Sequence, residues 1–434
     1  MTTNISDTAP LADEYTCPGD EHPISRSVHL SRLASFYPPC RDCPHCEDTG
    51  ELARQTVERL ASTRRRVARP THFTDEGIRA VHHNELTRGD AGHLAGALAW
   101  LLWQQQPPAI LPVDTPACTP RRGPIVVVGH DARSSAPDLV VGVLAQLVRS
   151  GCRTVEVGRV SRPCFTFAVD HLQAAAGIFV TGAGCDVAWT GLDAVTASAR
   201  PLSRGAGLEE WEARVRAGYQ RPTRQGGSRR SFAANELYES TLRRHFQPTR
   251  PLEVCLGAPP GPLAATLQRL FEPLPWSLDL VPCATRASDV RVARRVRETG
   301  AAIGLICHDD DSHVDVLDEC GRPVSSDALA TLLVTLILSE HPGNTIVISR
   351  DRGRHLDALV RRLGGRPRRT PGISRAETWQ TMHDQRAVLG LACQGDLWFR
   401  EATPTSDAVL VVARLLQALD RHEGPLSQLL QRGS

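Results

Sequence analysis

Short runs of β-branched residues alternate with longer apolar segments from about Thr71 to the end of this chain. The runs PIVVVGHD, TVEVGR and GIFVTG have the length and composition of buried parallel strands. The segments between them, PDLVVGVLAQLVRSG and FTFAVDHLQAA, have helical length, and Gly151 closes the first. This alternation predicts an α/β fold with mostly parallel sheets and right-handed crossovers.

The alternation recurs in two later stretches. In the second, LEVCLGAPPG, LDLVP and AAIGLICHDD predict strands, and in the third NTIVISRDRG and AVLGLACQGDLWF do so. A Gly/Arg-rich stretch, Arg221–Arg230, predicts a linker after the first unit. We therefore expect three similar α/β units at 71–205, 236–322 and 323–434, with a linker over 206–235.

Residues 1–70 lack this alternation. GELARQTVERLASTRRRVARP predicts a connecting helix within 51–70 that ends at Pro70. Residues 1–50 contain four of the 13 cysteines, and the other nine are scattered singly. We expect this segment to bind a structural Zn²⁺, because two pairs of S or N ligands can hold together a segment too small to fold alone.

The zinc ligands follow from spacing. Cys40-x2-Cys43 is typical of a zinc knuckle. The predicted ligands are Cys17, Cys40 and Cys43, completed by His29, His22 or Cys46. A redox CxxC and unpaired thiols in a tail are the two alternatives that the spacing leaves open.

Composition excludes several classes of function. The sequence contains no lysine, so its 50 cations are arginines and lysine Schiff-base chemistry is excluded. The formal net charge is +2 and the basic segments lack interleaved aromatic residues, so we expect no nucleic-acid partner. No apolar run reaches the roughly 20 residues of a membrane span, and we see no signal peptide. We therefore expect a cytoplasmic protein with reduced thiols and no membrane partner; the sequence predicts no oligomeric state.

Five segments, taken in order, carry a resemblance. FTDEGIRAVHHNELT is similar to F-G-T-D-G-I-R-G, VGHDARSSAP to G-x-D-x-R-x-S-S-P, and VSRPCFTFAVDHLQAAAGIFVTG to P-T-P…G-I-x-V-T-A. ETGAAIGLICHDDDSHVDVLDECGRPVSSD and AVLGLACQGDLWF follow. Together they resemble the alpha-D-phosphohexomutase family (phosphoglucomutase/phosphomannomutase) over roughly 73–430. The resemblance implies three consecutive α/β/α sandwich domains with mostly parallel sheets.

The resemblance also implies a catalytic loop. The family carries its phosphoryl group on the serine of T-A-S-H-N-P, which corresponds here to part of VTGAGCDVAWTGLDAV. Thr181 and Gly191 keep their places, but Ala183 stands at the serine position, and a methyl group cannot accept a phosphoryl group. Arg79 and Arg133 correspond to retained family arginines, for which anion binding and internal ion pairs are equal alternatives.

The family's Mg²⁺ loop, D-G-D-G-D-R, is altered. His308, Asp310 and Ser312 correspond to its three aspartates, and His313 takes the place of its arginine. Mg²⁺ prefers hard oxygen ligands, so a histidine and a serine are poor substitutes. We expect either a weakened or altered cation site or a solvated acidic turn.

The family's sugar-binding loop, G-G-E-x-S-G-H, is altered as well. Gly390 and Gly395 are retained, whereas Ala392, Gln394 and Asp396 replace the glutamate, serine and histidine. The R-x-S-G-T-E-P loop of the family's fourth module does not occur in these 434 residues, so we expect an open cleft.

These substitutions shape the functional expectation. The resemblance implies an isomerase fold of carbohydrate metabolism, and the missing serine predicts a pseudoenzyme without normal mutase turnover that binds a hexose phosphate or a protein partner. The first alternative is an active intramolecular phosphotransferase that interconverts hexose 1- and 6-phosphates with non-standard residues. The second is a zinc-dependent interaction protein in which the α/β units are only structural.

Overall fold

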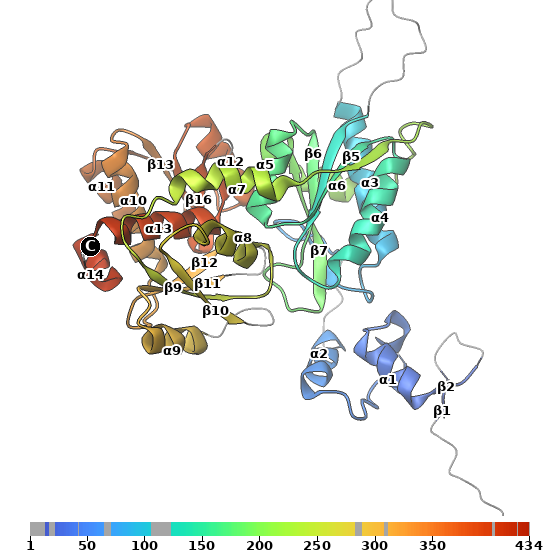
Figure 1. The fold of residues 1–434 in the computed structure, drawn as a ribbon. Coiled ribbons are helices and arrows are strands. Elements are labelled where there is room, and N and C mark those ends of the chain that lie inside the picture. Colours follow the sequence, from blue (N-terminus) through green and yellow to red (C-terminus); the bar gives the residue numbers. More distant parts are fainter. Residues whose placement is uncertain are drawn as a thin grey trace, which may run out of the picture.

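A computed structural model describes residues 14–16, 22–41, 43–64, 71–105, 123–282, 289–307, 311–401, 404–422 and 424–433. Four of the residues discussed above, Cys17, Pro70, His308 and Asp310, lie outside these ranges. The described residues form three larger sheets, and Figure 1 shows helices packed around them. The predicted α/β fold with mostly parallel sheets is confirmed.

The first large sheet has six strands. In spatial order they are β3 (Ile78–Val81), β7 (Trp189–Thr196), β6 (Ala176–Val180), β4 (Ile125–His130), β5 (Arg153–Arg159) and β8 (Ser228–Ser231). The last four are parallel to one another, and the pairings of β7 with β6 and with β3 are antiparallel. Its helices are α3 (Arg88–Gln105), α4 (Ala136–Arg149), α5 (Arg162–His171) and α6 (Leu208–Ala217).

Two hydrophobic cores lie on opposite faces of this sheet. Val126 and Val128 of β4 belong to the core that contains α3, α4 and α6. Val127 between them belongs to the core that contains α5. Successive side chains of a strand point to opposite faces of the sheet, so neighbouring residues of β4 belong to different cores.

Residues 206–235, which the sequence predicts as a linker, contain α6 and β8, and both pack on the first sheet. α6 buries Leu208 and Trp211 in the first core, and β8 extends the sheet by pairing in parallel with β5. All four residues of β8 are exposed. A polar edge strand discourages pairing with other chains, and for the same reason it has no apolar pattern in the sequence.

The second large sheet has four strands. In spatial order they are β10 (Ser277–Pro282), β9 (Glu253–Ala258), β11 (Ile303–Cys307) and β12 (Val314–Leu317), of which only β12 runs antiparallel. α8 (Pro262–Phe271) covers one face and α9 (Asp289–Thr299) covers the other.

The third large sheet has five strands. In spatial order they are β14 (Arg366–Arg369), β13 (Thr345–Ile348), β15 (Leu389–Leu391), β16 (Leu397–Arg400) and β17 (Pro404–Ser406). The first three are parallel, and the last two continue the sheet antiparallel. Its helices are α10 (Ser326–Glu340), α11 (His355–Arg362), α12 (Arg375–Asp384), α13 (Ala408–Arg421) and α14 (Leu426–Gly433).

One core joins the three sheets. It contains side chains of α5, of α7 (Ala234–Leu242), of α8 and of α10 and α13, and Figure 1 shows α7, α8 and α13 grouped where the sheets meet. Short 3-10 helices occur at η1 (Pro38–Arg41), η2 (Ala197–Ala199), η3 (Arg243–His245) and η4 (Cys393–Gly395). In the described part of the chain, no helix has both the length and the apolar character of a membrane span.

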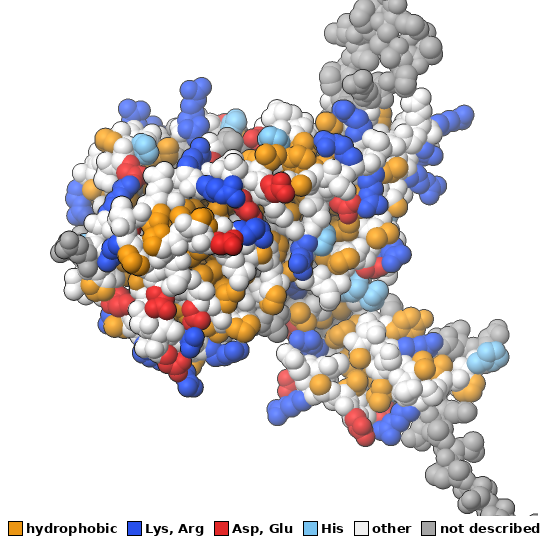
Figure 2. All heavy atoms as spheres, in the orientation of Figure 1, with side chains coloured by type: hydrophobic (Ala, Val, Ile, Leu, Met, Phe, Trp, Pro, Cys, Tyr) orange, Lys and Arg blue, Asp and Glu red, His pale blue; other side chains and the backbone are white. Residues whose placement is uncertain are grey.

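The N-terminal residues form a small body of their own. It contains β1 (Glu14–Tyr15), β2 (Ile24–Ser25), α1 (Arg26–Ala34) and α2 (Arg54–Arg64), and Leu33, Cys40 and Leu60 form its buried centre. α2 is the helix that the sequence predicts within 51–70. Figures 1 and 2 show this body below the first sheet, and Arg59 of α2 lies 3.8 Å from Asp186 in the loop between β6 and β7.

Candidate functional site

The loop between β6 and β7 contains the position of the missing nucleophile. Its ends are tied together, because the Thr181 amide donates to the Gly191 carbonyl oxygen at 3.0 Å. A Cβ at Gly191 would lie 1.7 Å from the Ile78 carbonyl oxygen, so only glycine fits there. The Ala183 amide donates to the Thr181 hydroxyl oxygen at 3.0 Å. Ala183 is thus an ordered position that presents a methyl group.

Arg79 points into the protein. Its guanidinium donates to the two carboxylate oxygens of Asp193 at 2.5 and 3.1 Å, and to the carbonyl oxygens of Ile78 at 2.9 Å and Ala183 at 3.3 Å. Only 11% of its side chain is exposed. Anion binding and an internal ion pair are the two alternatives for Arg79, and the structure contains the ion pair with Asp193.

Arg133 holds the backbone of the same loop. Its guanidinium donates to the carbonyl oxygens of Asp186 at 2.7 Å, Cys185 at 2.9 Å and Trp189 at 3.1 Å. Its Nε lies 3.6 Å from an oxygen of Asp131, and 8% of its side chain is exposed. The donors that would bind a substrate phosphate are therefore directed at the protein's own carbonyl groups.

Asp193 on β7 is the centre of a buried charge cluster. Besides Arg79, its carboxylate lies 2.6 Å from Arg162 on α5 and 3.6 Å from Arg375 on α12. Burial alone would raise the pKa of Asp193, but the charges of the three arginines lower it to about 2. The carboxylate is therefore ionised at neutral pH.

A second carboxylate links the same elements. Glu76 accepts a hydrogen bond from the Ser203 hydroxyl at 2.6 Å and one from the Arg375 amide at 2.9 Å. Burial raises the pKa of Glu76 despite the nearby charge of Arg375. Together Glu76 and Asp193 fasten the start of α12, from the third sheet, to the first sheet.

Sequence reasoning missed Glu76, Asp193, Arg162 and Arg375. The partners are far apart in the chain, and Glu76 and Arg375 are separated by 299 positions. One local signal was available: Ser374 and Glu377 form a capping box, which marks the start of α12 and places Arg375 in its first turn.

The described residues of the altered Mg²⁺ loop form hydrogen bonds with other parts of the chain. Asp311 accepts a hydrogen bond from the Leu263 amide at 3.2 Å, and the Ser312 carbonyl oxygen accepts one from the Ser406 hydroxyl at 2.7 Å. His308 and Asp310 lie outside the described residues. Among the described residues of this loop, no three His, Cys, Asp or Glu side chains have ligand atoms within 4.8 Å of one another.

His313 connects this loop to the altered sugar loop. Its Nδ1 lies 3.0 Å from Asp396 and its Nε2 lies 3.3 Å from Asp315. Burial alone would lower the pKa of His313, but the hydrogen bonds and charges of Asp315 and Asp396 raise it to about 9. His313 and Asp396 stand at two altered positions of the resemblance, and they form an ion pair between the second and third large sheets.

The remaining sugar-loop positions run from β15 through η4. Gly390 is packed on Met382, whose sulfur would lie 2.5 Å from an added Cβ, and Gly395 has φ +91°. Ala392 is buried, and Gln394 lies in η4 between these glycines. The structure thus brings the predicted loops at His313 and Asp396 together.

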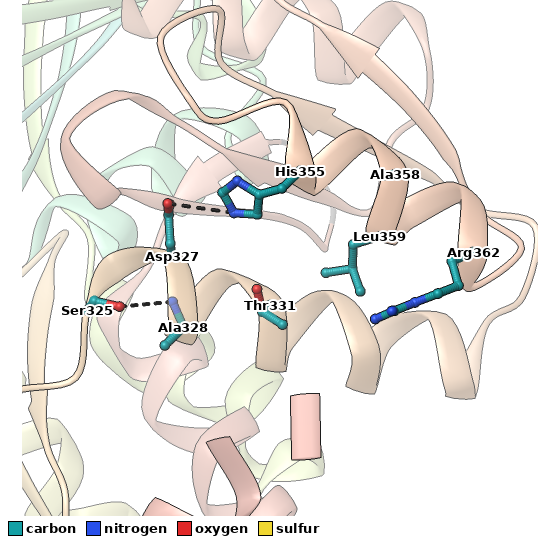
Figure 3. A pocket seen from close by; sticks show the side chains of 8 residues that line it. All are labelled: Ser325, Asp327, Ala328, Thr331, His355, Ala358, Leu359 and Arg362. Atoms are coloured by element: carbon teal, nitrogen blue, oxygen red, sulfur yellow. Dashed lines mark hydrogen bonds and ion pairs between the residues drawn. The ribbon is translucent and has the colours of Figure 1, made fainter. Parts of the chain in front are cut away.

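A pocket of about 460 Å³ lies between α10 and α11. Figure 3 shows Asp327 of α10 directed at His355 of α11, with their polar atoms 3.7 Å apart, and Arg362 at the other end. The pocket is lined by residues of these two helices and by Ser325. None of the sequence-predicted site residues is among them.

The predicted zinc ligands are incompletely assembled among the described residues. Cys40 and Cys43 are buried, Cys46 is half-buried and His22 is exposed. His29 is fully buried and stacks on Tyr15 at 4.0 Å. Its Nε2 lies 2.9 Å from the Asp48 carbonyl oxygen, whereas Nδ1 has no hydrogen-bond partner among the described residues. No three of the described candidates have ligand atoms within 4.8 Å of one another, and Cys17 lies outside the described residues.

Comparison with known proteins points to one family. A family model for phosphoglucomutase/phosphomannomutase, alpha/beta/alpha domain I, matches residues 71–206. A phosphomannomutase/phosphoglucomutase of Pseudomonas syringae pv. tomato is 24% identical over 71% of this chain and 68% of its own length. Phosphohexose mutases of Xanthomonas campestris pv. campestris are 28% identical over 64% of this chain and 65% of their own length.

A solved structure has the same fold. The phosphoglucomutase/phosphomannomutase family protein of Burkholderia thailandensis superimposes with a TM-score of 0.71 at 22% identity. The match covers 82% of this chain and 78% of that one. This chain spans about two thirds of the length of the curated relatives it matches.

Proposed function

Because this chain belongs to the alpha-D-phosphohexomutase family, we propose that it is a member of that family without mutase turnover, a pseudoenzyme of carbohydrate metabolism. The relatives named above are mutases, and phosphoryl transfer in such a site requires a nucleophile and cations aimed at the transferred group. The observation that carries the proposal is the arrangement of residues 180–191, the segment that contains the loop between β6 and β7.

This segment has neither the nucleophile nor the cations aimed at a transferred phosphoryl group. Position 183 is a methyl group, and Arg79 and Arg133 donate to Asp193 and to loop carbonyl oxygens. Releasing either arginine for a substrate phosphate would leave buried groups without partners, which costs about 1–3 kcal/mol for each group. The loop is therefore stabilised in a form that is not organised for a phosphoryl group.

Mg²⁺, the metal of the family, does not fit the described residues of its loop. A magnesium ion needs several converging oxygen ligands. Asp311 is bonded to a backbone amide and His313 is paired with two carboxylates. We therefore derive no catalytic step from Mg²⁺ in this chain.

The role we propose is binding. A hexose phosphate is the first ligand to test, because it is the substrate class that family membership implies, and a protein partner is the second. We also propose that the N-terminal body holds Zn²⁺ through Cys17, Cys40, Cys43 and His29. The buried Nδ1 of His29 supports this proposal, since a buried nitrogen without a partner needs an explanation.

Turnover assays test the proposal. Conversion of glucose 1-phosphate to glucose 6-phosphate would be followed with Mg²⁺, Mn²⁺ and Zn²⁺, with a phosphomannomutase/phosphoglucomutase as positive control. We expect no rate above that of an Arg79→Ala, Arg133→Ala variant. A higher rate would support the alternative, an active phosphotransferase with non-standard residues.

Thermal unfolding tests the binding role. A ligand that binds only the folded chain raises the unfolding midpoint as its concentration increases. We expect glucose 6-phosphate or mannose 6-phosphate to raise it, and an equal concentration of unphosphorylated glucose to have no effect. No shift with either phosphate would favour a protein partner.

A further inference from the structure

Two histidines and an aspartate meet outside the altered catalytic loops. His82 and His83 follow β3, and Asp138 lies in the first turn of α4. One ligand atom from each lies within 4.8 Å of the other two, and in the described part of the chain this is the one group of three His, Cys, Asp or Glu side chains that comes so close. All three residues are partly buried.

We propose that His82, His83 and Asp138 form a binding site for a borderline divalent transition metal such as Zn²⁺ or Ni²⁺. Imidazole nitrogens suit these ions, and one carboxylate completes a three-ligand set that leaves a position for water. Mg²⁺ is disfavoured because two of the three ligands are nitrogens.

The distances fit such an ion. Zinc–nitrogen and zinc–oxygen bonds of about 2.0–2.2 Å place tetrahedral ligand atoms roughly 3.4 Å apart. His82 Nε2 and Asp138 Oδ2 are 3.5 Å apart. The ring centroids of His82 and His83 are 3.7 Å apart, with the planes tilted by 35°. The ligand atoms of all three residues already lie within 4.8 Å of one another, so a small rotation of the His83 ring would complete the set.

The backbone holds both histidines in place. The His82 amide donates to the Ala188 carbonyl oxygen at 3.0 Å, and the His83 amide donates to that of Leu86 at 3.1 Å. His83 has φ +63°, a left-handed conformation that is uncommon for residues other than glycine, although histidine adopts it more often than most. A ligand that draws the two imidazoles together would account for this geometry.

The carboxylate is oriented for a ligand. Arg88 donates from Nε at 2.9 Å and from its terminal nitrogen at 2.5 Å, both to Asp138 Oδ1. This leaves Oδ2 facing His82. Such outer contacts orient metal ligands and improve affinity. Asn84, the residue after His83, has a buried Oδ1 without a hydrogen-bond partner in the described part of the chain, and an ordered water or ion would satisfy it.

Equilibrium dialysis of the full chain against Zn²⁺ tests the site. We would compare the wild-type chain with His83→Asn, which removes the imidazole but tolerates the positive φ, and with Asp138→Asn. His93→Asn is the matched control, because His93 is an exposed histidine on α3 that stacks on Tyr219 instead. We expect both cluster variants to lose one equivalent of Zn²⁺, or to bind it at least about tenfold more weakly, and the control to bind as wild type does. Equal binding by all four proteins would overturn the proposal.

Cobalt spectra separate this site from the cysteine segment. Thiolate ligands give Co²⁺ an intense charge-transfer absorption that imidazole and carboxylate ligands do not. We expect His83→Asn to lose one equivalent of Co²⁺ with the thiolate band unchanged. If the lost equivalent takes the thiolate band with it, the metal belongs to the N-terminal cysteines and the proposal is wrong. Unfolding midpoints measured in EDTA show whether each variant is folded, and Asp138→Asn serves if His83→Asn is not.

Discussion

The carboxylate of Asp193 faces three guanidinium groups and almost no solvent. Removing its charge would leave Arg79 and Arg162 buried without their counter-ion, and breaking a buried pair costs about 3–5 kcal/mol. We expect Asp193→Asn to lower the free energy of unfolding by that amount, measured by urea denaturation. Glu298→Gln, which breaks an exposed helical ion pair, is the control and should leave the midpoint unchanged. Equal midpoints for the two variants would contradict this role of Asp193.

The same carboxylate predicts an acid-dependent loss of stability. The pKa of Asp193 is about 2 in the folded chain and 3.8 as the reference value. A lowered folded-state pKa stabilises the protein above the unfolded value, and the contribution is lost as the pH falls through about 4 towards 2. The shift corresponds to about 2 kcal/mol. The stability difference between the wild-type chain and Asp193→Asn should therefore shrink between pH 5 and pH 2.5; a constant difference would contradict the ion pair.

A serine at position 183 tests whether the missing hydroxyl is the only defect of the site. Serine at this position would supply a hydroxyl, but Arg79 and Arg133 would remain bonded to the protein, and Asp311 would remain bonded to Leu263. Residues that act as a set lose most of their effect when one is missing. We expect Ala183→Ser to have no measurable glucose phosphate turnover with Mg²⁺. Turnover by this single variant would show that the rest of the site is intact.

At the scale of elements, His313 and Asp396 link the loop before β12 to the loop before β16. The pKa of His313 is raised to about 9 from 6.5. A raised folded-state pKa stabilises the protein fully below about pH 6.5, and this contribution, about 3 kcal/mol, is lost as the pH rises through 9. We expect the stability of the wild-type chain to fall over this window more than that of His313→Gln. His341→Gln, a change of an exposed histidine, should follow the wild-type profile; a parallel profile for His313→Gln would contradict the link.

Elements with apolar periodicity could be predicted from the sequence, and polar ones could not. β6 and β11 are buried along their length and β4 is buried in its four central residues, so their residues carry the pattern of a buried strand. β8 pairs through its backbone while its four side chains face solvent, so the same stretch resembles a linker. α12 was missed because its buried residues, Ala376, Thr378, Trp379 and Met382, include few aliphatic ones, although its capping box was visible.

At the scale of the whole molecule, the order of the loops could be predicted but their contacts could not. The resemblance placed Ala183, Arg79, His313 and Asp396 at family positions. Whether Arg79 faces a ligand depends on its partner Asp193, which lies 114 positions away in the sequence. No local sequence pattern indicates such a distant contact. The pairing of His313 with Asp396 likewise joins residues 83 positions apart. Two altered positions, His313 and Asp396, thus form a contact between the second and third large sheets.

With alanine at position 183, this chain should hold no phosphoryl group on any residue of 180–191. The most direct test is the intact mass of the purified protein after incubation with glucose 1,6-bisphosphate and Mg²⁺, with a phosphomannomutase/phosphoglucomutase treated in parallel. We predict that the control gains the mass of one phosphoryl group and that this chain gains none. A stable phosphorylated form of this chain, mapped to Cys185, Asp186 or any other residue of the 180–191 loop, would contradict the account.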